Sequence, residues 1–167
     1  TDTTRIDHRK LTRFVSRSLE KLHVSPGDAE IAAKVLVTSD LRGVDTHGVI
    51  RFNSHSWYVK WLREGSMTAR PNIQVVSESA TTALVDGDRG MGMVIGHRAM
   101  ELAIDKAKSA GIAMVGVRNS RHYGMSAYYS MLALPHDMIG IAMTNASRQV
   151  VPTFGREPRF GTNPMCF

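Results

Sequence analysis

The sequence has a single cysteine and no long apolar run, and these absences exclude several classes of protein. Cys166 is the only cysteine in 167 residues, so neither an internal disulfide nor a cysteine-ligated metal site is expected. We interpret it as a small buried apolar side chain rather than a reactive thiol. No stretch approaches the roughly 18 apolar residues that a membrane-spanning helix needs, and the opening TDTTRIDHRK is too polar for a signal peptide. We therefore expect a soluble, cytoplasmic protein that does not act at a membrane.

Aromatic residues are also few, at 7% of the chain, and charge of one sign is not concentrated anywhere. The 21 basic residues are interleaved with 15 acidic ones, giving a net charge of +6. Nucleic-acid binding is not indicated, because no basic stripe with interspersed aromatics is present. A diffuse positive potential favours small anionic substrates or a phosphate-bearing cofactor. The spacing of Trp57, Tyr58 and Trp61 is typical of one helix face in a core or a subunit contact.

Metal ligands are not indicated either, because the histidines show no H-x-x-x-H pairing with acids. The apolar periodicity instead predicts helices first and an alternation of strands and helices afterwards. Helices are expected at 7–24, 26–42 and 49–63, within 89–111 ending at Gly111, and from 124 to about Pro135. Strands are expected at 72–79, 81–88, 112–120 and 138–146. The last two strands are predicted to be buried. This order predicts an N-terminal helical segment at 1–70 and an α/β layer structure with some parallel pairing at 71–167.

The glycine-rich stretch GDRGMGMVIG lies between a predicted strand and a predicted helix. A dinucleotide-binding fingerprint needs G-x-G-x-x-G, whereas Gly90, Gly92 and Gly96 give G-x-G-x-x-x-G. An acidic strand end about 20 residues later is also missing, since Asp105 falls inside the predicted helix. We therefore interpret the glycines as a turn that lets the helix begin close to neighbouring backbone.

Two histidines occupy positions that favour chemistry. His122, in NSRHYG, follows a predicted strand at the edge where α/β enzymes collect catalytic groups, although it could equally cap a helix or bind its own loop. His47 lies in DLRGVDTHGVIRF, where Asp45 or Thr46 could fix its tautomer and Arg51 could grip a carboxylate. A helix beginning at 49 would place Arg51 one turn after His47 on the same side. The alternative is a polar helix start capped by Asp45 or Thr46, with Arg51 in solvent.

The stretches DLRGVDTHGVIRF, GVRNSRHYGMSAYYSMLA and TNASRQVVPTFGREPRFGTNP, linked by GHRAMELAIDKAKSAGI, closely resemble the type-2 malate/L-lactate dehydrogenase family. The resemblance covers nearly the whole chain in the same order. It implies an NAD(P)-dependent oxidoreductase with a non-Rossmann cofactor-binding α/β domain, usually a homodimer. Family members are roughly twice this length, so the α/β domain is expected to be incomplete here.

The resemblance also assigns roles to residues. His47 matches the proposed proton donor, and Arg51 matches the arginine that holds the substrate carboxylate. His122 matches a second histidine, which is the acid in some members and a cofactor-loop residue in others. Thr46 stands where Ser is common and keeps the hydroxyl for a relay to His47. Arg121 and Arg148 depart from the family, which commonly has Asn and Pro there. The cofactor surface is expected at Tyr123, Gly124, Met125, Ser126, Ser147, Thr162 and Asn163.

These roles predict hydride transfer between NAD or NADP and C2 of a small anionic 2-hydroxy or 2-oxo acid, such as malate or lactate. Reduction of a cyclic imino acid is an alternative within the same family. A non-catalytic fragment or dimerisation module that keeps the family surface is an alternative of a different class.

Overall fold

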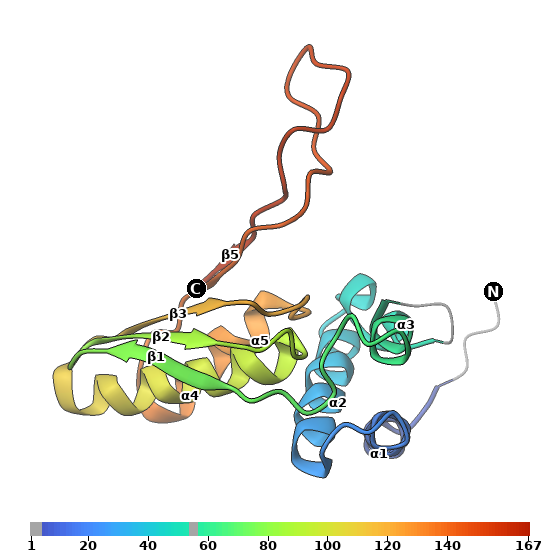
Figure 1. The fold of residues 1–167 in the computed structure, drawn as a ribbon, viewed down its shortest axis with the longest axis horizontal. Coiled ribbons are helices and arrows are strands. Elements are labelled where there is room, and N and C mark those ends of the chain that lie inside the picture. Colours follow the sequence, from blue (N-terminus) through green and yellow to red (C-terminus); the bar gives the residue numbers. More distant parts are fainter. Residues whose placement is uncertain (1–4, 54–56) are drawn as a thin grey trace. The chain divides into compact units, whose positions relative to one another are not determined.

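The computed structural model describes residues 5–53 and 57–167, and the chain divides into two compact units, Thr1–Met125 and Ser126–Phe167. In the first unit, helices and a three-stranded sheet follow each other along the chain (Figure 1). The division expected after residue 70 separates helical sequence from strand-rich sequence and stays a prediction.

Two helices begin the chain, α1 (His8–Glu20) and α2 (Pro26–Leu41). Both predicted N-caps are confirmed: the Asp7 carboxylate accepts the Lys10 N–H at 2.9 Å, and Ser25 Oγ accepts the Asp28 N–H at 3.3 Å. The expected apolar faces are largely buried, namely at Val15, Leu19, Ala32, Val35 and Leu36. Phe14 departs from this pattern, since 63% of it is exposed.

The single helix expected over 49–63 is not formed. The chain makes two short 3-10 turns, η1 (Asp45–His47) and η2 (Val49–Arg51), before the helix α3 (Trp57–Arg63). Phe52, which follows η2, has non-helical backbone angles (φ −115°, ψ 67°), so a continuous helix from residue 49 cannot pass through it. Residues 54–56, including His55, lie outside the described part of the chain.

The sheet has the order β1-β2-β3, with β1 (Gln74–Glu78) antiparallel to β2 (Thr82–Asp86) and β3 (Met114–Arg118) parallel to β2. The helix α4 (Gly92–Ala110) connects the parallel pair and runs along one face of the sheet (Figure 1). The predicted strand pair and the parallel pairing are therefore confirmed. The expected burial of β3 is wrong, because β3 is an edge strand whose Met114 is 70% exposed.

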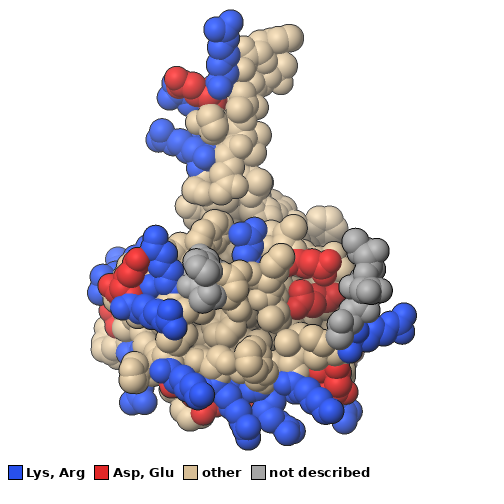
Figure 2. Space-filling view, turned by 90° about the vertical axis from the view of Figure 1, so that its right-hand side faces the viewer, with Lys and Arg blue, Asp and Glu red and all other residues tan. Residues whose placement is uncertain are grey.

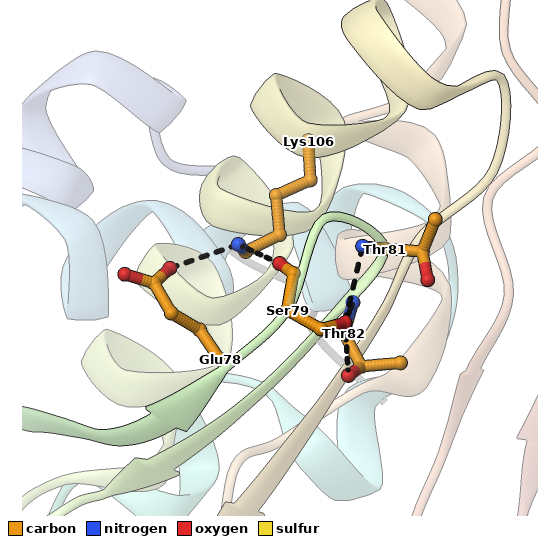
Figure 3. Close-up of polar contacts among 5 residues, drawn as sticks. All are labelled: Glu78, Ser79, Thr81, Thr82 and Lys106. Carbon is orange, nitrogen blue, oxygen red and sulfur yellow. Dashed lines mark hydrogen bonds and ion pairs between the residues drawn. The ribbon is translucent and has the colours of Figure 1, made fainter.

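A lysine of α4 holds the turn between β1 and β2 (Figure 3). Lys106 Nζ lies 2.8 Å from Glu78 Oε2 and donates to the Ser79 carbonyl at 2.7 Å. Ser79 Oγ in turn accepts the backbone N–H groups of Thr81 and Thr82. Only 13% of the Lys106 side chain is exposed, whereas 57% of the Glu78 side chain is exposed, so it is the lysine rather than its partner that is shielded from water.

The second unit contains α5 (Ser126–Met131), the turn η3 (Leu134–His136) and the short antiparallel pair β4 (Ala142–Met143) and β5 (Met165–Cys166). Between β4 and β5 the chain forms an extended loop closed by a bridge from Val150 to Phe160. The buried strand expected over 138–146 is wrong, since only two of its residues pair and Ile139 is 88% exposed. Cys166 is half-buried rather than buried, because a two-residue strand pair covers little side-chain surface.

Charged side chains of both signs are mixed on the surface. On the face shown in Figure 2, Lys and Arg side chains are interrupted by Asp and Glu side chains. Among the helices of the described residues, none combines the length and the apolarity that crossing a membrane requires.

Candidate active site

The DTHG segment is held by a carboxylate from the end of α2. Asp40 Oδ2 accepts the Val49 N–H at 3.0 Å, and a Cβ added to Gly48 would overlap the same carboxylate. Burial raises the pKa of Asp40 above its usual value, and the nearby Asp45 adds to this, although the bond from Val49 opposes it. The alternative of a helix start capped by Asp45 or Thr46 is wrong, because neither turn has a side-chain cap and Asp40 satisfies the backbone instead.

Thr46, His47 and Arg51 form one connected group within this segment. Thr46 Oγ1 lies 2.9 Å from His47 Nδ1, and Arg51 Nε donates to the Thr46 carbonyl at 2.5 Å. The Arg51 guanidinium lies over the Trp57 ring, 4.8 Å from its centroid. Arg51 is therefore placed by a backbone carbonyl and an aromatic face rather than by one shared helix. Within residues 5–53 and 57–167 its two Nη groups make no hydrogen bond, which leaves a fork able to bind a carboxylate.

The loop that carries His122 leaves the carboxyl end of β3, as expected. The Asp86 carboxylate at the end of β2 fixes the start of this loop by accepting Arg118 Nε at 2.9 Å and Asn119 Nδ2 at 3.0 Å. Gly92, the first residue of α4, lies against the loop, since a Cβ there would overlap the backbone of Arg121 and His122. The glycine turn thus brings a helix close to neighbouring backbone, as the sequence predicted. The loop backbone fills the space beside this helix start, where a Rossmann fold would bind pyrophosphate.

His122 is bound by Tyr58 of α3, although 64 residues separate them. Its Nδ1 lies 2.6 Å from the Tyr58 hydroxyl and also receives the Gly124 N–H at 3.4 Å. Tyr58 is completely buried, and this burial raises the pKa of its phenol above the ordinary value. Burial, followed by the neighbouring His47 and Arg51, lowers the pKa of His122 to about 4. His122 is therefore a neutral imidazole at physiological pH.

The fold brings the two candidate histidines together. Their rings are stacked with centroids 5.6 Å apart and an interplanar angle of 25°. Trp57 meets His122 edge-on at 5.8 Å, so Arg51, Trp57 and both histidines line one site. The pKa of His47 is also lowered, first by burial and then by Arg51. The group combines an arginine fork with two imidazoles whose pKa values are both lowered, which can bind an anion and exchange a proton.

Sequence reasoning missed two residues of this site. Tyr58 was interpreted only as core or a subunit contact, and it is core, but its hydroxyl binds His122. Asp40 was not singled out, although it begins the stretch that contains the DTHG segment. Its place at the end of a predicted helix, eight residues before Gly48, was the one local signal. No local signal could pair Tyr58 with His122, because that contact joins distant parts of the chain.

The residues expected to form a cofactor surface differ in exposure. Tyr123 is half-buried, whereas Gly124, Met125 and Ser126 are buried. Gly124 has a left-handed backbone with φ of 79° and lies against Val35 and Met93. In the second unit, Thr162 and Ser147 are exposed. Ser147 Oγ accepts a hydrogen bond from Gln149 Nε2 at 2.9 Å. Asn163 Oδ1 accepts the Ala146 N–H at 2.9 Å.

Arg121 is bound by the backbone of Ser66. Its Nε donates to the Ser66 carbonyl at 2.9 Å, and its guanidinium lies 5.9 Å from the Trp61 ring centroid. In the described part of the chain, no three His, Cys, Asp or Glu side chains gather in a way that could hold a metal ion.

A family model described as malate/L-lactate dehydrogenase matches residues 6–167 of this chain. The chain belongs to this family. The resemblance found in the sequence is thereby confirmed, together with the expected fold class of N-terminal helices followed by a non-Rossmann α/β part. The match extends through both compact units, from residue 6, just before α1, to the final residue of the sequence given.

Individual members of the family are similar in sequence and in fold. Malate dehydrogenase from Pyrococcus horikoshii is 47% identical over 161 residues, which are 96% of this chain and 44% of that protein. The structure of sulfolactate dehydrogenase from Methanocaldococcus jannaschii has a TM-score of 0.90 at 42% identity, over 96% of this chain and 46% of that one. Delta1-piperideine-2-carboxylate reductase from Pseudomonas syringae has a TM-score of 0.85 at 27% identity, over 98% and 48%. The chain thus spans about half the length of these relatives.

Proposed function

We propose that the protein carrying this site is an oxidoreductase that moves a hydride between NAD or NADP and C2 of a small 2-hydroxy or 2-oxo acid. The observation that carries the proposal is the convergence of Arg51, His47 and His122 from two segments about 70 residues apart. Relatives named malate dehydrogenase and sulfolactate dehydrogenase support an acid with a carboxylate next to the reacting carbon.

Arg51 is the proposed substrate clamp. Its Nε is bound to the Thr46 carbonyl and its plane rests on Trp57, so the guanidinium is oriented before any ligand arrives. A carboxylate bound by the two Nη groups would be fixed in the plane of the fork. Fixing the carboxylate also fixes which face of C2 meets the cofactor.

The two histidines are the proposed proton-handling groups. Oxidation of a hydroxyl releases a hydride and a proton, and a neutral imidazole can receive the proton. Both rings are biased toward the neutral form by burial and by Arg51. A bound substrate carboxylate offsets the charge of Arg51 and so favours the protonated imidazole that forms during oxidation.

A nicotinamide cofactor fits the chemistry of this site, since imidazole and guanidinium groups cannot accept a hydride themselves. The cofactor would supply the hydride acceptor at C4 of its nicotinamide ring. Tyr123 is half-buried in the first unit and Ser147 and Thr162 are exposed in the second, and each remains a proposed cofactor contact within its own unit. The choice between NAD and NADP and a homodimeric assembly remain part of the proposal.

A cyclic imino acid is the second candidate substrate. The similarity to a piperideine-2-carboxylate reductase favours it, because that substrate also carries a carboxylate beside the carbon that is reduced. A protonated imine needs less acid assistance than a carbonyl, so the two histidines would contribute less to its reduction.

The test compares His47→Ala, His122→Ala and Arg51→Lys in the native protein. Pyruvate, oxaloacetate and a cyclic imino acid are each assayed with NADH and NADPH. Loss of the proton-handling histidine is expected to lower turnover by about 100- to 10,000-fold. Arg51→Lys is expected to raise KM through loss of the two-pronged contact.

Cofactor binding is followed by NADH and NADPH fluorescence and should persist in all three variants. His8→Ala and Arg63→Lys change exposed residues on α1 and α3 and serve as matched controls. Near-normal turnover in both histidine variants would contradict the proposed mechanism. Absence of NADH or NADPH binding at millimolar concentration would instead favour a non-catalytic module.

A further inference from the structure

The hydroxyl of Tyr58 has one hydrogen-bond partner among the residues that the structure describes. The residue is completely buried, and within residues 5–53 and 57–167 its hydroxyl meets one partner, His122 Nδ1 at 2.6 Å. A buried phenol that did not donate this bond would leave its hydrogen without an acceptor, which is costly in a core. The hydroxyl therefore donates and Nδ1 accepts.

A second donor points at the same ring nitrogen. The Gly124 N–H is directed at His122 Nδ1 at 3.4 Å, and a backbone N–H can only donate. Gly124 is held in this position because its left-handed backbone packs against Val35 and Met93. Two donors aimed at one nitrogen require a lone pair on that nitrogen, so the proton of the neutral ring is on Nε2.

We propose that Tyr58 is a positioning residue that holds His122 in the neutral tautomer with its proton on Nε2. The inference rests on the proposed function for its catalytic meaning and on the hydrogen-bond geometry for the tautomer itself. In this tautomer His122 offers the substrate oxygen a hydrogen-bond donor. Its vacant nitrogen faces the buried Tyr58 and cannot reach a substrate proton.

The proton exchange therefore belongs to His47. In oxidation, a bound nicotinamide cofactor would supply the acceptor for the C2 hydride and its two electrons. The hydroxyl proton passes to the vacant ring nitrogen of His47, and C2–O becomes a carbonyl. Reduction reverses both transfers, and His122 keeps its Nε2 proton throughout while bonding the same oxygen.

The charged and titratable groups that face His122 all disfavour a second proton on it. His47 is stacked on the His122 ring, and Arg51 lies over the ring of Trp57, the neighbour of His122. The buried Tyr58 stays an uncharged phenol. Two imidazolium rings in contact would repel each other, so His47 can be charged during turnover only while His122 is neutral.

The tautomer is tested by long-range ¹H–¹⁵N NMR of the ligand-free native protein at neutral pH. Wild-type His122 is expected to show the pattern of an Nε2–H ring. Tyr58→Phe keeps the ring but removes the donor, so His122 should become a mixture of tautomers with a higher pKa. Val59→Ala is the matched control, because it loosens the packing of the same helix and keeps the phenol. It should leave the His122 pattern unchanged.

Measurements of kcat distinguish a His122 that only donates a hydrogen bond from a His122 that carries the substrate proton. His122→Gln keeps a donor and is expected to retain about a tenth of kcat, whereas His47→Gln should lose at least about 100-fold. Tyr58→Phe should lower kcat about tenfold, change KM little and shift the pH profile. Equal losses in the two glutamine variants would show that His122 carries the proton and would overturn the proposal.

The NMR experiment on the His122 tautomer requires no substrate. An Nδ1–H pattern in the wild type, or an unchanged pattern in Tyr58→Phe, overturns the role of Tyr58 even if the protein is an active dehydrogenase. An Nε2–H pattern that Tyr58→Phe disrupts supports that role even if no hydroxy acid is turned over. Failure of this inference and failure of the proposed function are therefore distinguishable.

Discussion

At the scale of single residues, the site depends on a position that has no side chain. Gly48 separates the two 3-10 turns, and its Cα lies against the Asp40 carboxylate that accepts the Val49 N–H. A side chain there would displace the carboxylate and free a backbone donor. The placement of His47 on one side and Arg51 on the other therefore follows from the contact between Asp40 and Gly48.

Gly48→Ala tests this dependence. We expect it to lower the free energy of unfolding by about 1–3 kcal/mol, because the new methyl group overlaps the Asp40 side chain. Gly27→Ala is the matched control, since a Cβ at Gly27 in α2 would meet nothing within 4 Å. The control should change stability by less than about 1 kcal/mol. Equal effects in urea denaturation would show that the contact with Asp40 is unimportant.

At the scale of elements, α4 is attached to the sheet at both of its ends. Its first residue, Gly92, lies against the loop that carries His122, and Lys106 near its C-terminus binds the turn between β1 and β2. The connection from β2 through α4 to β3 positions the His122 loop at the carboxyl ends of the parallel strands. Through α4, the sheet therefore helps to keep the His122 loop in place.

Lys106→Met is expected to lower the free energy of unfolding by about 1–2 kcal/mol, because the Ser79 carbonyl and the Glu78 carboxylate lose a shielded charged donor. Lys108→Met removes a lysine from the same helix whose bond to Asp105 is exposed, and it should cost at most about 0.5 kcal/mol. Chemical denaturation of both variants makes the comparison. A loss for Lys108→Met as large as that for Lys106→Met would contradict the role given to shielding.

At the scale of the whole molecule, the two compact units differ in how much of their backbone is protected. The first unit has a core in which Val35 and Leu36 of α2 are completely buried. In the second unit, the loop between β4 and β5 exposes Val151 at 44% and Phe154 fully. Few buried contacts and exposed backbone allow local opening without global unfolding.

Hydrogen exchange of the 167-residue chain should show this difference directly. Amides of 32–36 in α2 are expected to exchange slowly, whereas most amides of 151–158 should exchange fastest. The Gly155 N–H, which donates to the Pro152 carbonyl at 2.8 Å, is the exception we expect in that loop. Protection of 151–158 equal to that of α2 would contradict this view of the second unit.

The sequence by itself determined the local features. Caps at Asp7 and Ser25 predicted the first helices, because a cap bonds to backbone within its own turn. The spacing of the glycines excluded a dinucleotide fingerprint, and the resemblance in the DTHG and SRHYG segments identified the family and both histidines. Each of these signals lies within a few residues of what it predicts.

Only the tertiary structure decided which distant residues act together. The stacking of His47 on His122 and the bond from Tyr58 to His122 join segments 75 and 64 residues apart, and no local pattern encodes such contacts. Tertiary context also overrode local expectation, since Asp40 rather than Asp45 or Thr46 satisfies the Val49 N–H and the helix expected from 49 is broken at Phe52. The wrongly predicted burial of β3 has the same origin, because strand burial depends on which elements cover the sheet rather than on the strand's own residues.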